Sequence, residues 1–169
     1  TLGRTFTTLV GPLAVLAALG QSVWACIALW SENAATIQET LWRWIHIGDL
    51  QLEVGFQVDP LTALFLLIIT GIGFLIHVYS AGYMADEEHY GRFFAFLNLF
   101  VFFMLVLVLA DNLLLMFVGW EGVGLCSYLL IGFYHEKISA GEAAKKAFLF
   151  NRVGDFGVLS AVMMLVVYL

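Results

Sequence analysis

Residues 113–133 read LLLMFVGWEGVGLCSYLLIGF, an almost unbroken apolar run whose one charged residue is Glu121. A helix needs about 20 mainly apolar residues to cross a hydrocarbon layer about 30 Å thick, and this run has the required length. At a rise of about 1.5 Å per residue, Glu121 would lie near the middle of that layer. The stretch therefore predicts a transmembrane helix that carries a buried acid.

The whole chain has the composition of a membrane protein. Of its 169 residues 62% are hydrophobic and 12% are charged, whereas apolar residues make up about half of a soluble domain. Similar apolar runs cover about residues 8–30, 61–80, 93–110 and 144–169, so the sequence predicts about five spans. The expected fold is all-α, a polytopic transmembrane helix bundle that forms a single membrane region over residues 1–169. Because the chain starts at Thr1 and stops within an apolar run, we expect it to be a fragment of a longer subunit.

Short polar segments mark where the predicted helices begin. Asp59 can cap the second helix, and Pro60 suits its first position, where a missing N–H has no cost. Asp111 and Asn112 form a very short turn before residues 113–133, so the third and fourth spans are expected to be antiparallel neighbours. The sequence SAGE at residues 139–142 fits a capping box at the start of the fifth span.

A hydrophobic alternation separates the first two spans. Between residues 50 and 58, apolar residues alternate with polar residues or glycine, behind a predicted turn at Gly48-Asp49. This pattern is typical of a β-hairpin, which we place at about residues 45–58, outside the membrane. Trp42 and Trp44, just before it, suit the region of the lipid headgroups.

The basic residues are distributed unequally across the predicted membrane. With five alternating spans, one side contains only Arg43, and the other side contains Arg4, Arg92, Lys137, Lys145 and Lys146. Lys and Arg accumulate on the cytoplasmic side of membrane proteins. The basic side is therefore expected to face the cytoplasm or matrix, and the hairpin the periplasm or intermembrane space.

Glu121 is the first candidate for chemistry. A carboxylate in the apolar centre of a membrane costs several kcal/mol unless it is protonated, paired or hydrated. Such a group can take up and release protons, so we interpret Glu121 as a proton-translocating residue. The structural alternative is that Glu121 only forms a hydrogen bond in helix packing. The glycines at positions 119, 122 and 124 allow close helix packing and also leave room for water.

The fifth span contains a second charged pair. Arg152 and Asp155 are three positions apart and therefore lie on one face of a helix, where they can pair. Counted inward from the basic side, their depth is similar to that of Glu121, so water or one side chain could connect the two carboxylates. We assign Arg152 and Asp155 to the same proton-translocating site. The structural alternative is a pair that only neutralises itself.

Three further residues are candidates for a proton relay. His77 in the second span and His135 after the fourth lie toward the basic side, and imidazole titrates near pH 7. Tyr128 lies two turns from Glu121 on the same helix face and can bond to a water chain. Each has a structural alternative, because the histidines suit headgroup depth and the tyrosine can simply pack.

The sequence contains no sign of a redox centre. It has no Walker loop, dinucleotide-binding fingerprint, cysteine cluster or haem motif, so no cofactor and no metal are expected on this chain. Cys26 and Cys126 lie alone inside apolar spans and are interpreted as small buried residues. The net charge of -6 argues weakly against nucleic-acid binding.

Several segments resemble the family of distal antiporter-like subunits of respiratory complex I, the NADH:quinone oxidoreductase, called chain five in mitochondria and chain L in bacteria. The longest is GWEGVGLCSYLLIGF at residues 119–133, and the others are ADNLLLM at 110–116, NRVGD at 151–155, FLIHVY at 74–79 and RFFA at 92–95. The likeness covers nearly the whole chain from Trp42 onward.

The resemblance implies a proton-translocating subunit of an enzyme, a translocase that couples electron transfer from NADH to quinone to proton pumping. Glu121 matches the key glutamate of the family, and Arg152 and Asp155 match its functional ion pair. In the family, that glutamate pairs with a lysine on a later helix, beyond the part that this chain matches.

The resemblance also implies that NADH, FMN, iron–sulfur clusters and quinone bind to partner subunits. The expected partners are other membrane subunits of complex I, especially a neighbouring antiporter-like subunit, together with the lipid bilayer and protons. The expected location is a bacterial inner membrane, with the mitochondrial inner membrane as the alternative. The nearest alternative function is a subunit of a multi-subunit sodium/proton antiporter, and a structural membrane anchor is a more distant one.

Overall fold

The computed structural model describes residues 2–31, 35–47 and 50–168. Its helices and strands are α1 (Leu2–Ser31), β1 (Ile37–Ile47), β2 (Leu50–Val58), α2 (Pro60–Tyr83), α3 (Tyr90–Leu109), α4 (Leu113–Ile131) and α5 (Ile138–Tyr168). Within these described ranges, five helices are long and apolar enough to cross a membrane. The predicted helical membrane fold with a hairpin between its first two spans is confirmed. The turn predicted at Gly48-Asp49 lies outside the described residues.

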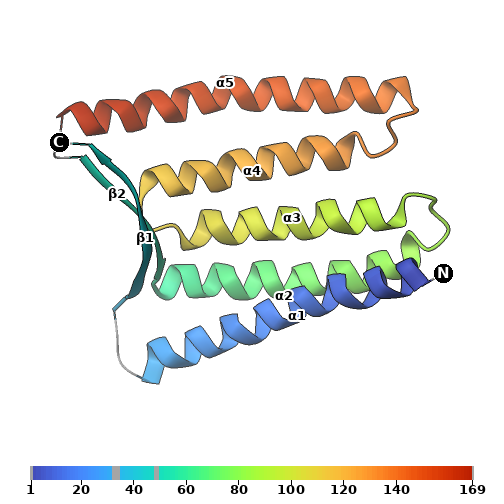
Figure 1. Ribbon diagram of the computed structural model, residues 1–169, viewed down its shortest axis with the longest axis horizontal. Helices are drawn as coiled ribbons and strands as arrows, with labels where there is room; N and C mark the ends of the chain where they lie inside the picture. The colour runs from blue at the N-terminus through green and yellow to red at the C-terminus, as the bar shows by residue number, and fades with distance from the viewer. Residues whose placement is uncertain (1, 32–34, 48–49, 169) are drawn as a thin grey trace.

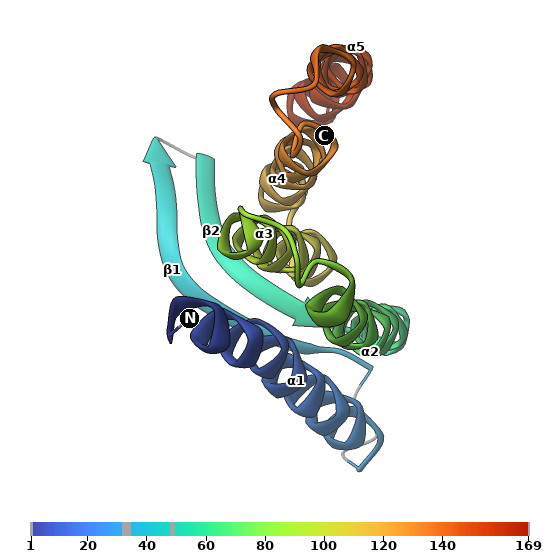
Figure 2. The same cartoon turned by 90° about the vertical axis from the view of Figure 1, so that its right-hand side faces the viewer.

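The helices lie side by side, and successive helices run in opposite directions (Figure 1). α1, α2 and α3 pack together, α4 packs on α3, and α5 packs mainly on α4, so α5 forms the far edge of the row (Figure 2). The hairpin lies at one end of the helices, and the N-terminus lies at the other end with the loops after α2 and α4 (Figure 1). The predicted basic side is this second end.

Side-chain caps begin two of the helices as predicted. The carboxylate of Asp59 accepts the backbone N–H of Thr62 at 2.6 Å, and Pro60 occupies the first position of α2. The side chain of Asn112 accepts the N–H of Leu115 at 2.9 Å at the start of α4. Each cap satisfies a backbone donor that has no partner inside its helix. Because α4 starts so soon after α3 ends, the two helices are antiparallel neighbours.

The outermost helices extend beyond the apolar runs that predicted them. α1 starts six residues before the predicted span at about residue 8, and the Thr7 and Thr8 hydroxyls donate to carbonyls four residues back in its polar first turns. α5 starts at Ile138, where the Lys137 carbonyl accepts the N–H of Ala140, so the predicted capping box at residues 139–142 lies inside the first turn. Hydropathy locates the membrane-crossing part of a helix, whereas local hydrogen bonds decide where the helix ends.

The hairpin is longer than predicted. β1 pairs with β2 in antiparallel register from Ile37 opposite Val58 to Ile47 opposite Leu50. The register shifts between Thr40 and Trp42, and again after Arg43. A strand with bulges does not keep a strict alternation of polar and apolar residues, which explains why the sequence pattern identified β2 but not the start of β1.

The turn between α3 and α4 is bonded to the hairpin. Asn112 Nδ2 donates to the Glu53 carbonyl at 2.8 Å, and the Asp111 N–H donates to the Gly55 carbonyl at 3.3 Å. A Cβ atom at Gly55 would overlap the carboxylate of Asp111, so any larger residue would have to displace that side chain. The hairpin therefore holds the beginning of α4, the helix that carries Glu121.

Two glycines bring α4 close to α3. A Cβ atom at Gly119 would lie 2.5 Å from the backbone nitrogen of Leu107, and one at Gly122 would overlap the ring of Phe103. Small residues at such a contact let two helix backbones approach closely in lipid. This contact turns Glu121, which lies between the two glycines, toward the opposite side of α4, where α5 packs.

Candidate functional site: an ionic cluster between α4 and α5

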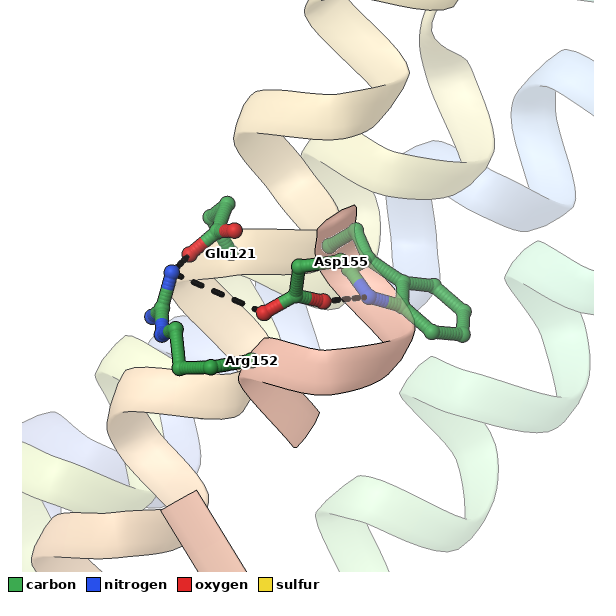
Figure 3. A network of polar contacts seen from close by, with 4 residues as sticks. Glu121, Arg152 and Asp155 are labelled. Carbon is green, nitrogen blue, oxygen red and sulfur yellow. Dashed lines mark hydrogen bonds and ion pairs between the residues drawn. The ribbon is translucent and has the colours of Figure 1, made fainter. Parts of the chain in front are cut away.

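The structure brings together the three residues that the sequence assigned to proton translocation. Arg152 Nη1 on α5 donates to Glu121 Oε2 on α4, and the same nitrogen lies 3.5 Å from Asp155 Oδ2 (Figure 3). The expected pairing of Arg152 with Asp155 across one helical turn is present. One guanidinium nitrogen is thus shared by two carboxylates from two helices.

The cluster is more enclosed at one carboxylate than at the other. The exposed fraction of the side chain is 9% for Asp155, 23% for Glu121 and 39% for Arg152. When both carboxylates are ionised, one arginine leaves one excess negative charge in an apolar layer, where unbalanced charge is expensive. Binding one proton makes the cluster neutral. By this count of charges, the arrangement has room for one added proton.

A tryptophan completes the cluster. Trp120 Nε1 donates to Asp155 Oδ1 at 2.8 Å (Figure 3). Trp120 is not among the site residues predicted from the sequence. Its position next to Glu121 was visible in the sequence, but tryptophan is also common at lipid-facing positions of membrane helices, so the residue type alone gives no sign of a carboxylate partner.

Aromatic contacts connect the cluster to Tyr128. The guanidinium carbon of Arg152 lies 4.4 Å from the ring centroid of Phe148, a cation–π distance. The ring of Phe148 in turn lies 5.4 Å from that of Tyr128. Tyr128 is therefore one aromatic side chain away from Arg152.

Tyr128 also lines a cavity of about 260 Å³ between α3, α4 and the start of α5. The other residues that line it include Arg92 and His135, toward the basic end, and two glycines, Gly132 and Gly141. A water molecule occupies about 30 Å³ in the liquid, so a cavity of this size with polar residues in its wall can hold water. Two of the three predicted relay residues, Tyr128 and His135, thus share one cavity.

Arg92 holds His135 at the basic end of the cavity. Arg92 Nη2 lies 3.1 Å from His135 Nδ1 and donates to the Phe133 carbonyl at 3.0 Å. A guanidinium can only donate, so the shorter contact of Nδ1 favours the neutral tautomer with its proton on Nε2 over a bond from Nδ1 to the Phe133 carbonyl, which is 3.5 Å away. The ring of His89 lies 5.8 Å from that of His135. His135 is the point where the cavity meets the basic end of the helices.

The third predicted relay residue, His77, lies elsewhere in the bundle. Its side chain is fully buried, and Nδ1 is 2.7 Å from the carbonyl of Gly73 on its own helix. Nε2 has no hydrogen-bond partner among the described residues. The ring packs against Phe94 of α3 at 6.0 Å. The ring of His77 is therefore buried where α2 packs against α3.

The cysteines do not belong to this site. Cys126 is completely buried, and Cys26 is partly buried with its Sγ atom 3.6 Å from the Ala63 carbonyl. Both are free thiols. In the described ranges, no group of three or more His, Cys, Asp or Glu residues is arranged to hold a metal ion.

Comparisons with known proteins cover most of the chain. Residues 44–94 match the family described as the N-terminus of chain 5 of NADH-ubiquinone oxidoreductase (complex I), and residues 110–169 match the transmembrane family of NADH:quinone oxidoreductase and Mrp antiporters. NADH-quinone oxidoreductase subunit L of Mycobacterium tuberculosis is 50% identical over 151 residues, which are 88% of this chain and 24% of that protein. The subunit L of Escherichia coli is 52% identical over 129 residues, which are 76% of this chain and 21% of that protein.

A solved structure agrees with these relatives. The Mrp complex from Dietzia sp. DQ12-45-1b contains a similar chain, with a TM-score of 0.81 and 28% sequence identity over 99% of this chain and 18% of that one. The chain spans about a quarter of the length of the curated relatives it matches. The matched residues include the whole ionic cluster, because positions 120, 121, 152 and 155 lie within residues 110–169. This chain belongs to the antiporter-like membrane subunits of the NADH:quinone oxidoreductase and Mrp antiporter family.

Proposed function

We propose that this chain forms part of a proton-translocating membrane subunit of NADH:quinone oxidoreductase, with Glu121 as the residue that exchanges protons. The observation that carries the proposal is the shared contact of Arg152 with Glu121 and Asp155. Two carboxylates and one guanidinium need one proton to be neutral, so the cluster has a built-in reason to bind and release a proton. The relatives named subunit L support the assignment to this enzyme.

In the proposed mechanism, Arg152 changes the proton occupancy of Glu121 by changing its own position. While Arg152 bonds Glu121, the cation balances the charge of the carboxylate. When Arg152 turns toward Asp155, Glu121 loses this partner and takes up a proton to avoid an uncompensated charge in the membrane. The two contacts start from the same Arg152 nitrogen, so a small rotation of one side chain is sufficient.

The cavity at the basic end would deliver the proton. His135 lies where the cavity meets the basic end and Tyr128 lies deeper in it, and both can bond to water. From Tyr128, the path to the cluster passes Phe148, whose ring separates the two polar regions. A movement of Arg152 off the Phe148 ring would open this path at the same time as it frees Glu121.

The remaining components of the enzyme would lie on other subunits. We place NADH, FMN, the iron–sulfur clusters and quinone there, and propose a neighbouring antiporter-like subunit as the partner in the membrane. Bacterial proteins dominate the similar relatives, which also include one chloroplast protein, and this supports a bacterial inner membrane over a mitochondrial one. A sodium/proton antiporter subunit is the second candidate, because the structural neighbour is an Mrp complex.

Replacing Glu121 by glutamine tests the proposal. The assembled enzyme with the full-length subunit is reconstituted in vesicles, and proton translocation is measured per NADH oxidised. Because an amide cannot exchange the proton, Glu121→Gln is expected to lower translocation by about tenfold or more. The matched control is Glu142→Gln, which removes the same charge from the exposed first turn of α5 and should leave translocation unchanged.

Two results would contradict the proposal. Normal translocation in Glu121→Gln would leave the chain as a membrane anchor. Translocation that requires sodium in the wild-type protein would favour the antiporter.

A further inference from the structure

The two oxygens of Asp155 have different partners. Oδ1 accepts the indole N–H of Trp120 at 2.8 Å, whereas Oδ2 lies 3.5 Å from Arg152 Nη1. The distance to the indole nitrogen is typical of a hydrogen bond, whereas the distance to Arg152 is at the upper limit for one. Asp155 is therefore bonded more closely to a neutral donor on α4 than to the arginine on its own helix.

Two adjacent residues of α4 bond two residues of α5 that lie one helical turn apart. Trp120 bonds Asp155, and the next residue, Glu121, bonds Arg152, one turn earlier on α5 (Figure 3). Two contacts at two points define how the helices are placed along each other. The Trp120 contact and the Arg152 contact therefore share one pair of helices and one carboxylate, Asp155.

The indole ring is only partly enclosed by neighbouring side chains. Half of residue Trp120 is exposed, whereas the side chain of Asp155 is 9% exposed. The buried carboxylate would lose its closest donor if the N–H were removed, and a buried charge without a donor draws the nearest cation toward itself. That cation is Arg152, whose buried Nε atom has no hydrogen-bond partner among the residues that the structure describes.

From this geometry we infer that Trp120 is a positioning residue that controls how Arg152 is divided between Glu121 and Asp155. The indole N–H compensates part of the charge of Asp155, so that Arg152 remains free to bond Glu121. The inference rests on the proposed function, and it adds a neutral hydrogen-bond donor to the three charged residues of the site.

Two substitutions separate the N–H from the size of the ring. Trp120→Phe retains an aromatic ring but has no donor, whereas Trp120→His has a smaller ring with an N–H. The assembled enzyme is reconstituted in vesicles, and proton translocation per NADH oxidised is measured. Trp120→Phe should lower translocation by about tenfold, because losing a hydrogen bond to a charged group changes a two-state balance by about that factor. Trp120→His should restore most of it.

The control is Trp44→Phe in the hairpin. Trp44 is 47% exposed and Trp120 is 50% exposed, so the two changes alter similarly exposed rings. Trp44→Phe should leave translocation unchanged. If Trp120→Phe translocates normally, or if the histidine variant loses as much as the phenylalanine variant, Trp120 does not act through its N–H and the inference is wrong. Normal proton translocation in Glu121→Gln would instead contradict the proposed function itself.

A spectroscopic measurement decides the question if Trp120→Phe does not assemble. Ultraviolet resonance Raman spectra of the wild-type enzyme and of Asp155→Leu are compared in the bands that report hydrogen bonding of the indole N–H. Loss of the acceptor should shift the Trp120 contribution toward a free N–H. Identical spectra would show that Asp155 is not the partner of Trp120 and would overturn the inference.

Discussion

Two buried side chains of α2, Thr70 and His77, form their shortest hydrogen bonds within their own helix, whereas the charged side chains of α4 and α5 bond across the two helices. The Thr70 hydroxyl donates to the Leu66 carbonyl at 2.6 Å, and His77 Nδ1 bonds the Gly73 carbonyl at 2.7 Å, each four residues back in the same helix. In the other region, Glu121 bonds Arg152 on the next helix.

The difference follows from what each side chain can donate. A hydroxyl or an imidazole N–H carries a hydrogen and can donate it to the carbonyl one turn back, so this bond needs no other helix. An ionised carboxylate only accepts, and the backbone N–H groups inside a helix are already used. Glu121 and Asp155 must therefore find donors on other side chains, which ties α4 to α5 and makes this region the one where a proton changes the contacts.

The largest effect is expected from removing the shared cation. Arg152→Gln leaves two carboxylates without their common partner, so proton translocation should fall by more than about tenfold and less enzyme should assemble. Arg152→Lys keeps the charge and should recover part of both. Translocation is measured in vesicles and assembly on native gels. An Arg152→Gln enzyme that assembles and translocates normally would remove the contrast between the two regions.

Adding one methyl group tests the close packing that orients Glu121. Gly122→Ala places a Cβ atom in the ring of Phe103, and overpacking of this kind costs about 1–3 kcal/mol. Gly124→Ala is the matched control, since its Cβ would meet only Asn151 Nδ2 at 3.8 Å. Thermal unfolding in detergent should show a lower midpoint for the first variant alone. Equal midpoints would mean that α3 and α4 accommodate the extra methyl group without a loss of stability.

The caps of α2 and α4 should differ in their response to pH. The backbone N–H of Thr62 holds the pKa of the Asp59 carboxyl below its ordinary value. A lowered pKa stabilises the folded state above the ordinary pKa of aspartate, and this stabilisation is lost as pH falls through the lowered value, below about pH 4. The amide cap of Asn112 does not titrate.

Asp59→Asn should therefore remove the acid sensitivity of this cap while keeping its hydrogen bond, and Asp59→Ala should cost about 1 kcal/mol at neutral pH. The measurement is the unfolding midpoint of the wild type and of both variants between about pH 3 and pH 7. An Asp59→Asn protein with the same acid response as wild type would contradict it.

The smallest effect on translocation is expected at His77. His77→Leu removes a hydrogen bond within one helix, which should lower stability by about 0.5–1.5 kcal/mol. Because His77 does not contact the ionic cluster, translocation should fall by less than about twofold. His135→Leu is the comparison, because His135 lines the cavity that leads toward Glu121. A loss at His77 as large as that at Glu121 would support the sequence-based hypothesis of a relay through His77 and would give the α2 region a role in proton transfer.

Much of the site could be predicted because its signals are local. A charged residue in an apolar run identified Glu121, and a spacing of three placed Arg152 and Asp155 on one helix face. The role of Trp120 could not be predicted, because its partner is 35 positions away and indole rings serve several purposes in membranes. For the same reason, the sequence grouped His77 with Tyr128 and His135, although His77 packs in a different part of the bundle.

The sequence by itself determined the membrane fold, the number of spans, two helix caps and the three charged residues, because apolar length, capping chemistry and helical spacing act over a few residues. Only the tertiary structure decided that one nitrogen of Arg152 serves both carboxylates and that Trp120 holds Asp155. Those contacts depend on the distance and register between α4 and α5, which follow from the packing of whole helices and are not encoded in any local pattern.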